Sequence, residues 1–137
     1  MTVENPIVSS PISPLPQKPG MVTAIAVMTL VNGILNILYS LSLTAGVVLG
    51  TFGIGLLCAP LTILPIVLGI FEILYATKLL SNPPQPTQPS QTIAILEIVC
   101  ILFGNVVSTV VGILALVFYN DPAVKAYFTQ ISAQPQA

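Results

Sequence analysis

The residues that could do chemistry are two acids and three amides set in long apolar stretches. Glu72 is the twelfth residue of the apolar stretch 61–80, and Glu97 lies in the first turns of a later one. Asn32, Asn36 and Asn105 are the intramembrane amides. Ionisable residues inside a membrane are costly and are therefore candidates for function. No cation in the chain can reach Glu72, because the three lysines lie at the ends of the apolar stretches.

The free energies of the two protonation states favour a neutral Glu72. Keeping a carboxyl neutral at pH 7 costs about 3.7 kcal/mol, given its reference pKa of about 4.3. Burying the unpaired anion costs considerably more. We therefore expect Glu72 to be protonated and hydrogen-bonded to Asn32 or Asn36 on a facing helix, a contact that sets helix register. We expect Glu97 to face headgroup water from the start of its span, where the positive end of the helix favours an acid.

Small and polar residues recur on one face of each apolar stretch. At 100° per residue, Asn32 and Asn36 share a narrow arc with neighbouring small residues, and Glu72 and Glu97 each lie on a similar stripe. Small residues let helices approach closely in lipid, so these stripes predict helix contacts. The predicted packing residues are Gly33, Gly46, Gly50, Gly69, Gly104, Ser108 and Gly112.

Composition excludes most classes of function. Of 137 residues, 55% are hydrophobic and 5% are charged, whereas soluble domains carry about 25% charged residues. The net charge of -1 leaves no basic surface for nucleic acid, and the absence of histidine removes the usual general base. Cys58 and Cys100 lie in apolar runs and are expected to be small buried hydrophobes. We expect neither an enzyme nor a metal or cofactor site.

The elements that must position these residues are membrane helices. Three stretches, 22–43, 61–80 and 93–119, are long enough to cross about 30 Å of hydrocarbon. Residues 44–58 are short and glycine-rich, so they either cross as a short helix or re-enter. Segment 31–39 matches 67–75 at six of nine positions, and a parallel duplication would require 44–58 to cross between the two copies. We therefore predict an all-α integral membrane protein, a four-transmembrane-helix bundle over 21–119.

Proline-rich segments and a short helix surround this bundle. Residues 1–20 predict a disordered tail, and 81–92 predict an aqueous loop. Within 120–137, Asp121 can cap a helix that begins at Pro122. Its apolar face predicts an amphipathic helix in the membrane interface, formed by Val124, Tyr127, Phe128 and Ile131.

The orientation of the bundle depends on few charges. With four spans, Lys18 and Lys125 share one side of the membrane and Lys78 flanks the other. The positive-inside tendency then places both termini in the cytoplasm.

The end of the chain resembles many uncharacterised small bacterial membrane proteins of four spans. In those proteins the last helix also ends at a Pro-x-Val-Lys-x-Tyr-Phe tail, matched here by Pro122, Val124, Lys125, Tyr127 and Phe128. The resemblance implies this topology and a bacterial inner membrane. We expect a structural, accessory or assembly role in the bilayer, as a homo-oligomer or in a larger membrane complex. The alternative is a small proton-coupled transporter or channel that uses Glu72.

Overall fold

The computed structural model describes residues 16–133, and within this range it is entirely helical, without strands. Most of the predicted tail over 1–20 lies outside the described residues. The elements are α1 (Gly20–Gly50), the short 3-10 helix η1 (Ile54–Cys58), α2 (Ala59–Leu80), α3 (Gln91–Val99), the 3-10 helix η2 (Cys100–Phe103), α4 (Val106–Tyr119) and α5 (Pro122–Ser132).

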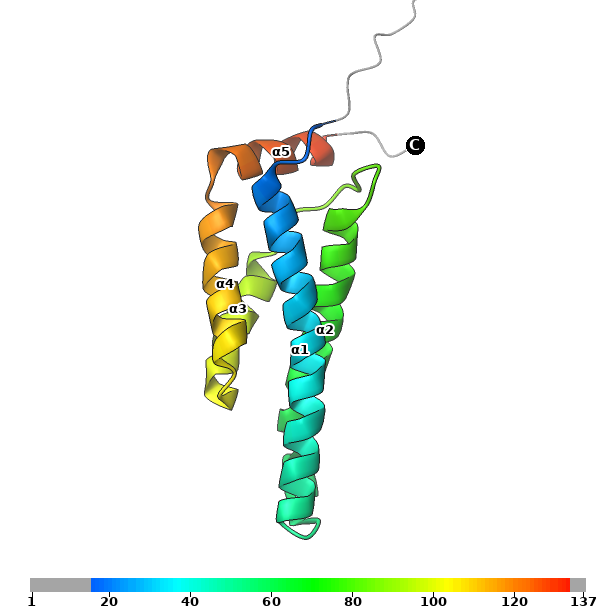
Figure 1. The fold of residues 1–137 in the computed structure, drawn as a ribbon, viewed down its shortest axis with the longest axis vertical. Helices are drawn as coiled ribbons and strands as arrows, with labels where there is room; N and C mark the ends of the chain where they lie inside the picture. Colours follow the sequence, from blue (N-terminus) through cyan, green and yellow to red (C-terminus); the bar gives the residue numbers. More distant parts are fainter. Residues whose placement is uncertain (1–15, 134–137) are drawn as a thin grey trace, which may run out of the picture.

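Helices α1 and α2 form a long antiparallel hairpin (Figure 1). The 31 residues of α1 extend over about 47 Å at 1.5 Å per residue. The two backbones meet at a pair of glycines. A Cβ built on Gly69 would lie 2.5 Å from the Gly33 carbonyl oxygen, and one on Gly33 would lie 2.8 Å from that of Gly69. The stripe prediction is thus confirmed at these two positions.

Residues 44–58 do not form a span of their own, which corrects the prediction of a short second crossing. Helix α1 continues to Gly50, and the chain then reverses through Phe52 and Gly53, whose φ angles are 52° and 92°. The two matching segments consequently run in opposite directions on facing helices. The parallel duplication is therefore wrong, although the match does bring Gly33 against Gly69 and Asn36 against Glu72.

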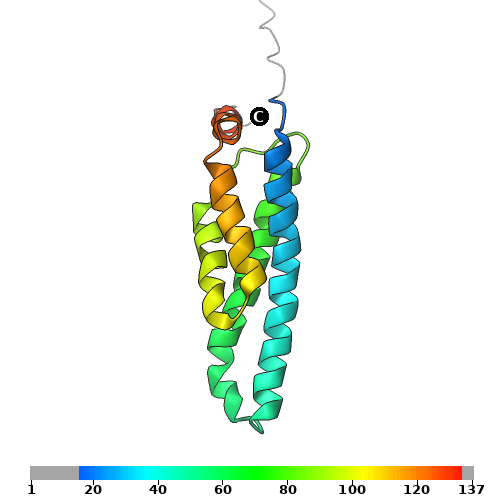
Figure 2. The same ribbon diagram turned by 60° about the vertical axis from the view of Figure 1, so that its left-hand side comes forward.

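The predicted span 93–119 is also corrected, because it is a helical hairpin. Helix α3 and η2 end at Gly104, which has a φ of 78°, and α4 starts after Asn105 and runs back. The 14 residues of α4 cover about 21 Å, too little to cross the hydrocarbon. Figures 1 and 2 show this hairpin beside only part of the longer α1–α2 hairpin.

Within the described residues, two helices are long and apolar enough to cross a membrane. They are α1 and α2, and a third span results only if α4 and α5 are joined across a 78° bend. Four spans are not shown. Buried positions carry polar side chains such as Asn32, Asn36 and Glu72, whereas large apolar side chains cover the outside. This inversion of a soluble protein suits a lipid environment.

One end of the molecule gathers the start of α1, the loop after α2 and α5 (Figure 1). The Lys18 ammonium donates to the Leu79 carbonyl at 2.5 Å and to that of Ser81 at 3.2 Å, capping the end of α2. Lys78 lies in the last turn of the same helix, and Lys125 lies in α5. The prediction that Lys78 flanks the opposite side is therefore wrong.

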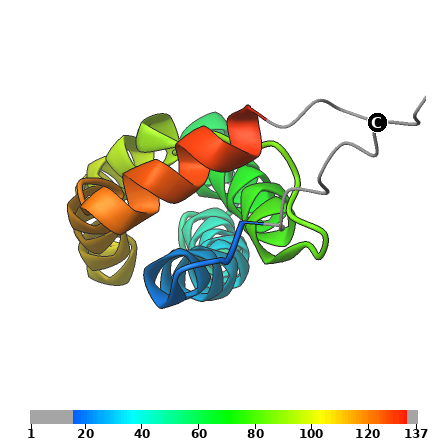
Figure 3. The ribbon, with the colours of Figure 1, turned by 90° about the horizontal axis from the view of Figure 1, so that it is seen from above.

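Helix α5 lies across this end of the bundle (Figure 3). Its predicted cap is confirmed, because the Asp121 carboxylate accepts from the Ala123 and Val124 amides at 2.8 and 3.4 Å. The four residues of the predicted apolar face, Val124, Tyr127, Phe128 and Ile131, do share one face, and this face is buried. It packs on protein rather than on lipid, which corrects the expectation of a helix resting its apolar face in the membrane interface.

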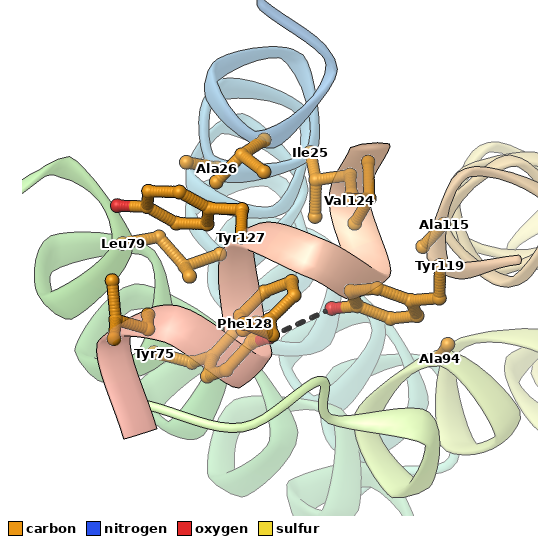
Figure 4. Packing of buried hydrophobic residues seen from close by; sticks show 12 residues of the cluster. Ile25, Ala26, Tyr75, Leu79, Ala94, Ala115, Tyr119, Val124, Tyr127 and Phe128 are labelled. Carbon is orange, nitrogen blue, oxygen red and sulfur yellow. Dashed lines mark hydrogen bonds between the residues drawn. The ribbon is translucent and has the colours of Figure 1, made fainter. Parts of the chain in front are cut away.

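The contacts of α5 close the end of the helix bundle. Its buried face lies against Ile25 and Ala26 of α1 and Leu79 of α2 (Figure 4). The rings of Phe128 and Tyr119 meet edge to face with centroids 6.1 Å apart. Because α1, α2 and α4 all contribute to this cluster, α5 joins the two hairpins.

Candidate functional site

A buried polar cluster lies where α1, α2, α3 and α4 meet. It collects all five intramembrane polar candidates and one packing candidate. Glu72, Glu97, Asn36 and Ser108 have no exposed surface, and Asn32 and Asn105 are 1% and 7% exposed. The members, which we call the polar cluster, are Asn32, Asn36, Glu72, Glu97, Asn105 and Ser108.

The hydrogen-bond partners of Glu72 are those predicted. The Asn36 side-chain amide lies 2.9 and 3.1 Å from the two carboxyl oxygens of Glu72. The Asn32 amide lies 3.2 Å from both. Since Asn32 and Asn36 are one turn apart on α1, both reach across the hairpin to one carboxyl group.

The position of Glu97 differs from the prediction. It does not face headgroup water, because its Oε1 accepts from the same Asn32 amide at 3.4 Å inside the bundle. The reason is the hairpin, since α3 packs closely on α4 and turns Glu97 toward α1. A close approach of α4 supports this placement: a Cβ on Gly112 would clash with the Ala94 carbonyl and lie 2.9 Å from Cβ of Glu97.

The start of α4 supplies the remaining members. Asn105 accepts from the Ser108 backbone amide at 3.1 Å, which caps α4, and its own amide donates to Oδ1 of Asn36 at 2.6 Å. The Ser108 hydroxyl accepts from the Asn32 amide at 3.1 Å. Sequence reasoning missed the roles of Asn105 as a cap and Ser108 as a hydrogen-bond partner. The signal for the cap was present, because asparagine is a favoured N-cap residue and Gly104, before it, is the residue type that most often ends a helix.

The cluster has more hydrogen-bond acceptors than donors. One Asn32 amide nitrogen, with two hydrogens, faces both oxygens of Glu72, one of Glu97 and the Ser108 hydroxyl. Two buried oxygens, Asn32 Oδ1 and Glu97 Oε2, have no partner. None of the lysines in the described residues hydrogen-bonds to these carboxyls. The cluster can therefore bind a cation, and the smallest cation that its oxygens could bind is a proton.

The predicted packing glycines separate into three groups. Gly33, Gly69 and Gly112 each face a neighbouring backbone so closely that a side chain would clash. Gly104 instead provides the left-handed turn of the short hairpin. Around Gly46 and Gly50 nothing in the described chain lies within 4 Å of an added Cβ. These last two residues therefore make no helix contact inside the protein.

The neighbourhood of the cluster is apolar. Cys100 is buried as expected, whereas Cys58 is exposed at the far end of the α1–α2 hairpin, contrary to the prediction. A groove of about 490 Å³ between α2 and α3 is lined mostly by apolar side chains, among them Leu68, Phe71 and Leu96. In the part of the chain that the structure describes, no group of three or more metal-ligating side chains is placed to hold an ion.

Comparisons with protein-family models, with curated proteins and with solved structures found no match to this chain.

Proposed function

We propose that this protein is a multi-pass protein of a bacterial inner membrane with a structural, accessory or assembly role. It acts through helix contacts buried in lipid, with further copies of itself or within a larger membrane complex. Both termini are proposed to be cytoplasmic, because all three lysines lie at the end of the molecule where α1 begins and α5 lies.

The observation that carries the assembly role is an unoccupied stripe of small residues on α1. Ser42, Gly46 and Gly50 recur every four residues on the part of α1 farthest from α5, and all three are exposed. The α3–α4 hairpin does not extend this far (Figure 2). Small residues at this spacing let a second membrane helix approach closely.

Replacing the glycines of this stripe with bulky residues tests the assembly role. We expect the double variant Gly46→Ile and Gly50→Ile to lose self-association without unfolding, because the added side chains meet open space. Light scattering coupled to size exclusion in mild detergent measures the mass. Ala24→Ile, which adds similar bulk to an exposed position elsewhere on α1, is the control and should behave as the wild type. A monomeric wild-type protein that elutes without a stoichiometric partner contradicts the proposal.

A second candidate function is a small proton-coupled transporter or channel with Glu72 as the carrier. One observation favours it: Glu97, from another hairpin, shares the Asn32 amide with Glu72. Two carboxyls joined by one donor form a short route for a proton. Helix hairpins broken inside the membrane are also typical of transporter binding sites.

Proton flux into liposomes distinguishes this candidate. If the candidate is correct, wild-type protein raises the rate of internal acidification under an imposed potential, and Glu72→Gln lowers it to the rate of empty liposomes. Asp121→Asn is the matched control, since it removes an acid that lies outside the polar cluster. Equal rates for wild-type and empty liposomes exclude the candidate and leave the assembly role untouched.

A further inference from the structure

A single proton could join the two unpaired oxygens of the polar cluster. Asn32 Oδ1 and Glu97 Oε2 lack partners, and the same two side chains are already joined by the bond from Asn32 Nδ2 to Glu97 Oε1 at 3.4 Å. A carboxylic acid and a primary amide can pair through two parallel hydrogen bonds. In that pair the amide N–H donates to one carboxyl oxygen, and the acid O–H donates to the amide oxygen.

We propose that Glu97 is a proton-binding site, with its proton on Oε2 donating to Oδ1 of Asn32. One proton then satisfies both unpaired atoms and closes a two-bond ring between α3 and α1. The cost of leaving two buried acceptors unsatisfied disappears. The proposal concerns a contact within one chain, so it stands apart from the assembly role.

The geometry distinguishes Glu97 from Glu72. Both oxygens of Glu72 already face amide donors from Asn32 and Asn36. A proton on Glu72 that donates to the adjacent Glu97 carboxyl would still leave Oδ1 of Asn32 without a partner. The proton expected on Glu72 from the sequence is therefore assigned to Glu97. Glu72 is left as the group that accepts hydrogen bonds.

The groups around Glu97 are acidic or neutral, so they favour the protonated carboxyl. The titratable groups close enough to interact with it are Glu72 from α2, Cys100 from η2 and Tyr119 from α4. The facing residues of α1 are amides. No cationic side chain of the described residues replaces the proton as a source of positive charge.

Infrared spectroscopy of the full chain in lipid nanodiscs tests the assignment. A protonated carboxyl has a C=O stretching band that a carboxylate lacks, and solvent-exposed acids are ionised at pH 7. We expect the wild type to show this band, Glu97→Gln to lose it and Glu72→Gln to retain it. Loss of the band in Glu72→Gln, its persistence in Glu97→Gln, or its absence from the wild type overturns the proposal.

The melting temperature provides a second measurement, which remains informative even if a variant folds poorly. Glutamine at position 97 supplies an N–H for Asn32 Oδ1 and an oxygen for Asn32 Nδ2, so it reproduces both bonds of the ring. Glu97→Gln should therefore keep the melting temperature of the wild type, whereas Glu97→Leu should lower it by several degrees. Equal losses in the two variants contradict the proposed ring.

Discussion

Gly69→Leu is expected to prevent the α1–α2 hairpin from closing and to destabilise the protein by about 3 kcal/mol, the upper end of the usual cost of overpacking. A Cβ alone would lie 2.5 Å from the Gly33 carbonyl oxygen and 3.0 Å from Cγ1 of Ile37. The obstacle is backbone, which cannot rotate away, so the helices must separate. Separation would also pull Asn36 away from Glu72. The fraction of monodisperse protein that survives heating in detergent measures the effect.

Gly46→Leu is the control for this prediction. It makes the same change in the interior of α1, where an added Cβ meets nothing within 4 Å. We expect the thermal stability of its monomeric fraction to match that of the wild type. Leucine has a higher helix propensity than glycine, so a similar loss in both variants would mean that the close approach at Gly69 does not determine the result.

Glu72→Leu is expected to cost about 3 kcal/mol, because it removes the shared acceptor of two buried amides. Asn32 and Asn36 would lose the hydrogen bonds that cross the hairpin and keep only their contacts to Glu97 and Ser108. Each N–H that is left unsatisfied in the interior costs about 1–3 kcal/mol. Glu72→Gln should cost less, since its amide keeps one of the two acceptor oxygens. The same heating assay gives the order of the three proteins.

Phe71→Leu provides the comparison for Glu72→Leu. Phe71 is the preceding residue of α2 and is 56% exposed, so its replacement leaves the polar cluster intact. We expect a change below about 0.5 kcal/mol, as for most surface positions. If Glu72→Leu proves as stable as Phe71→Leu, the carboxyl does not hold the hairpin together.

The polar stripes were predictable because helical periodicity alone determines which residues share a face. Asn32, Asn36 and Glu72 were placed correctly in this way, and the residues that share the apolar face of α5 were identified, although not what they pack against. In lipid, a polar or ionisable side chain that faces hydrocarbon is costly, so the stripe that carries it faces the protein. Periodicity therefore predicts contacts even where the chain path is wrong.

The chain path was less predictable, because hydropathy measures only how apolar a segment is. A stretch of 27 apolar residues has the same hydropathy whether it crosses once or turns back. What decides here is Gly104, which adopts a left-handed conformation, followed by Asn105 as a helix cap. The error in the depth of Glu97 follows from the missed turn.

The division of the acids between two hairpins has a consequence for biosynthesis. The α1–α2 hairpin contains Glu72 together with both of its amide partners, so it is complete before α3 leaves the ribosome. The α3–α4 hairpin is too short to cross the bilayer and brings Glu97, whose partner Asn32 is already in place. We therefore expect the two hairpins to enter the membrane in order, so that the α3–α4 hairpin packs on an α1–α2 hairpin that has already formed.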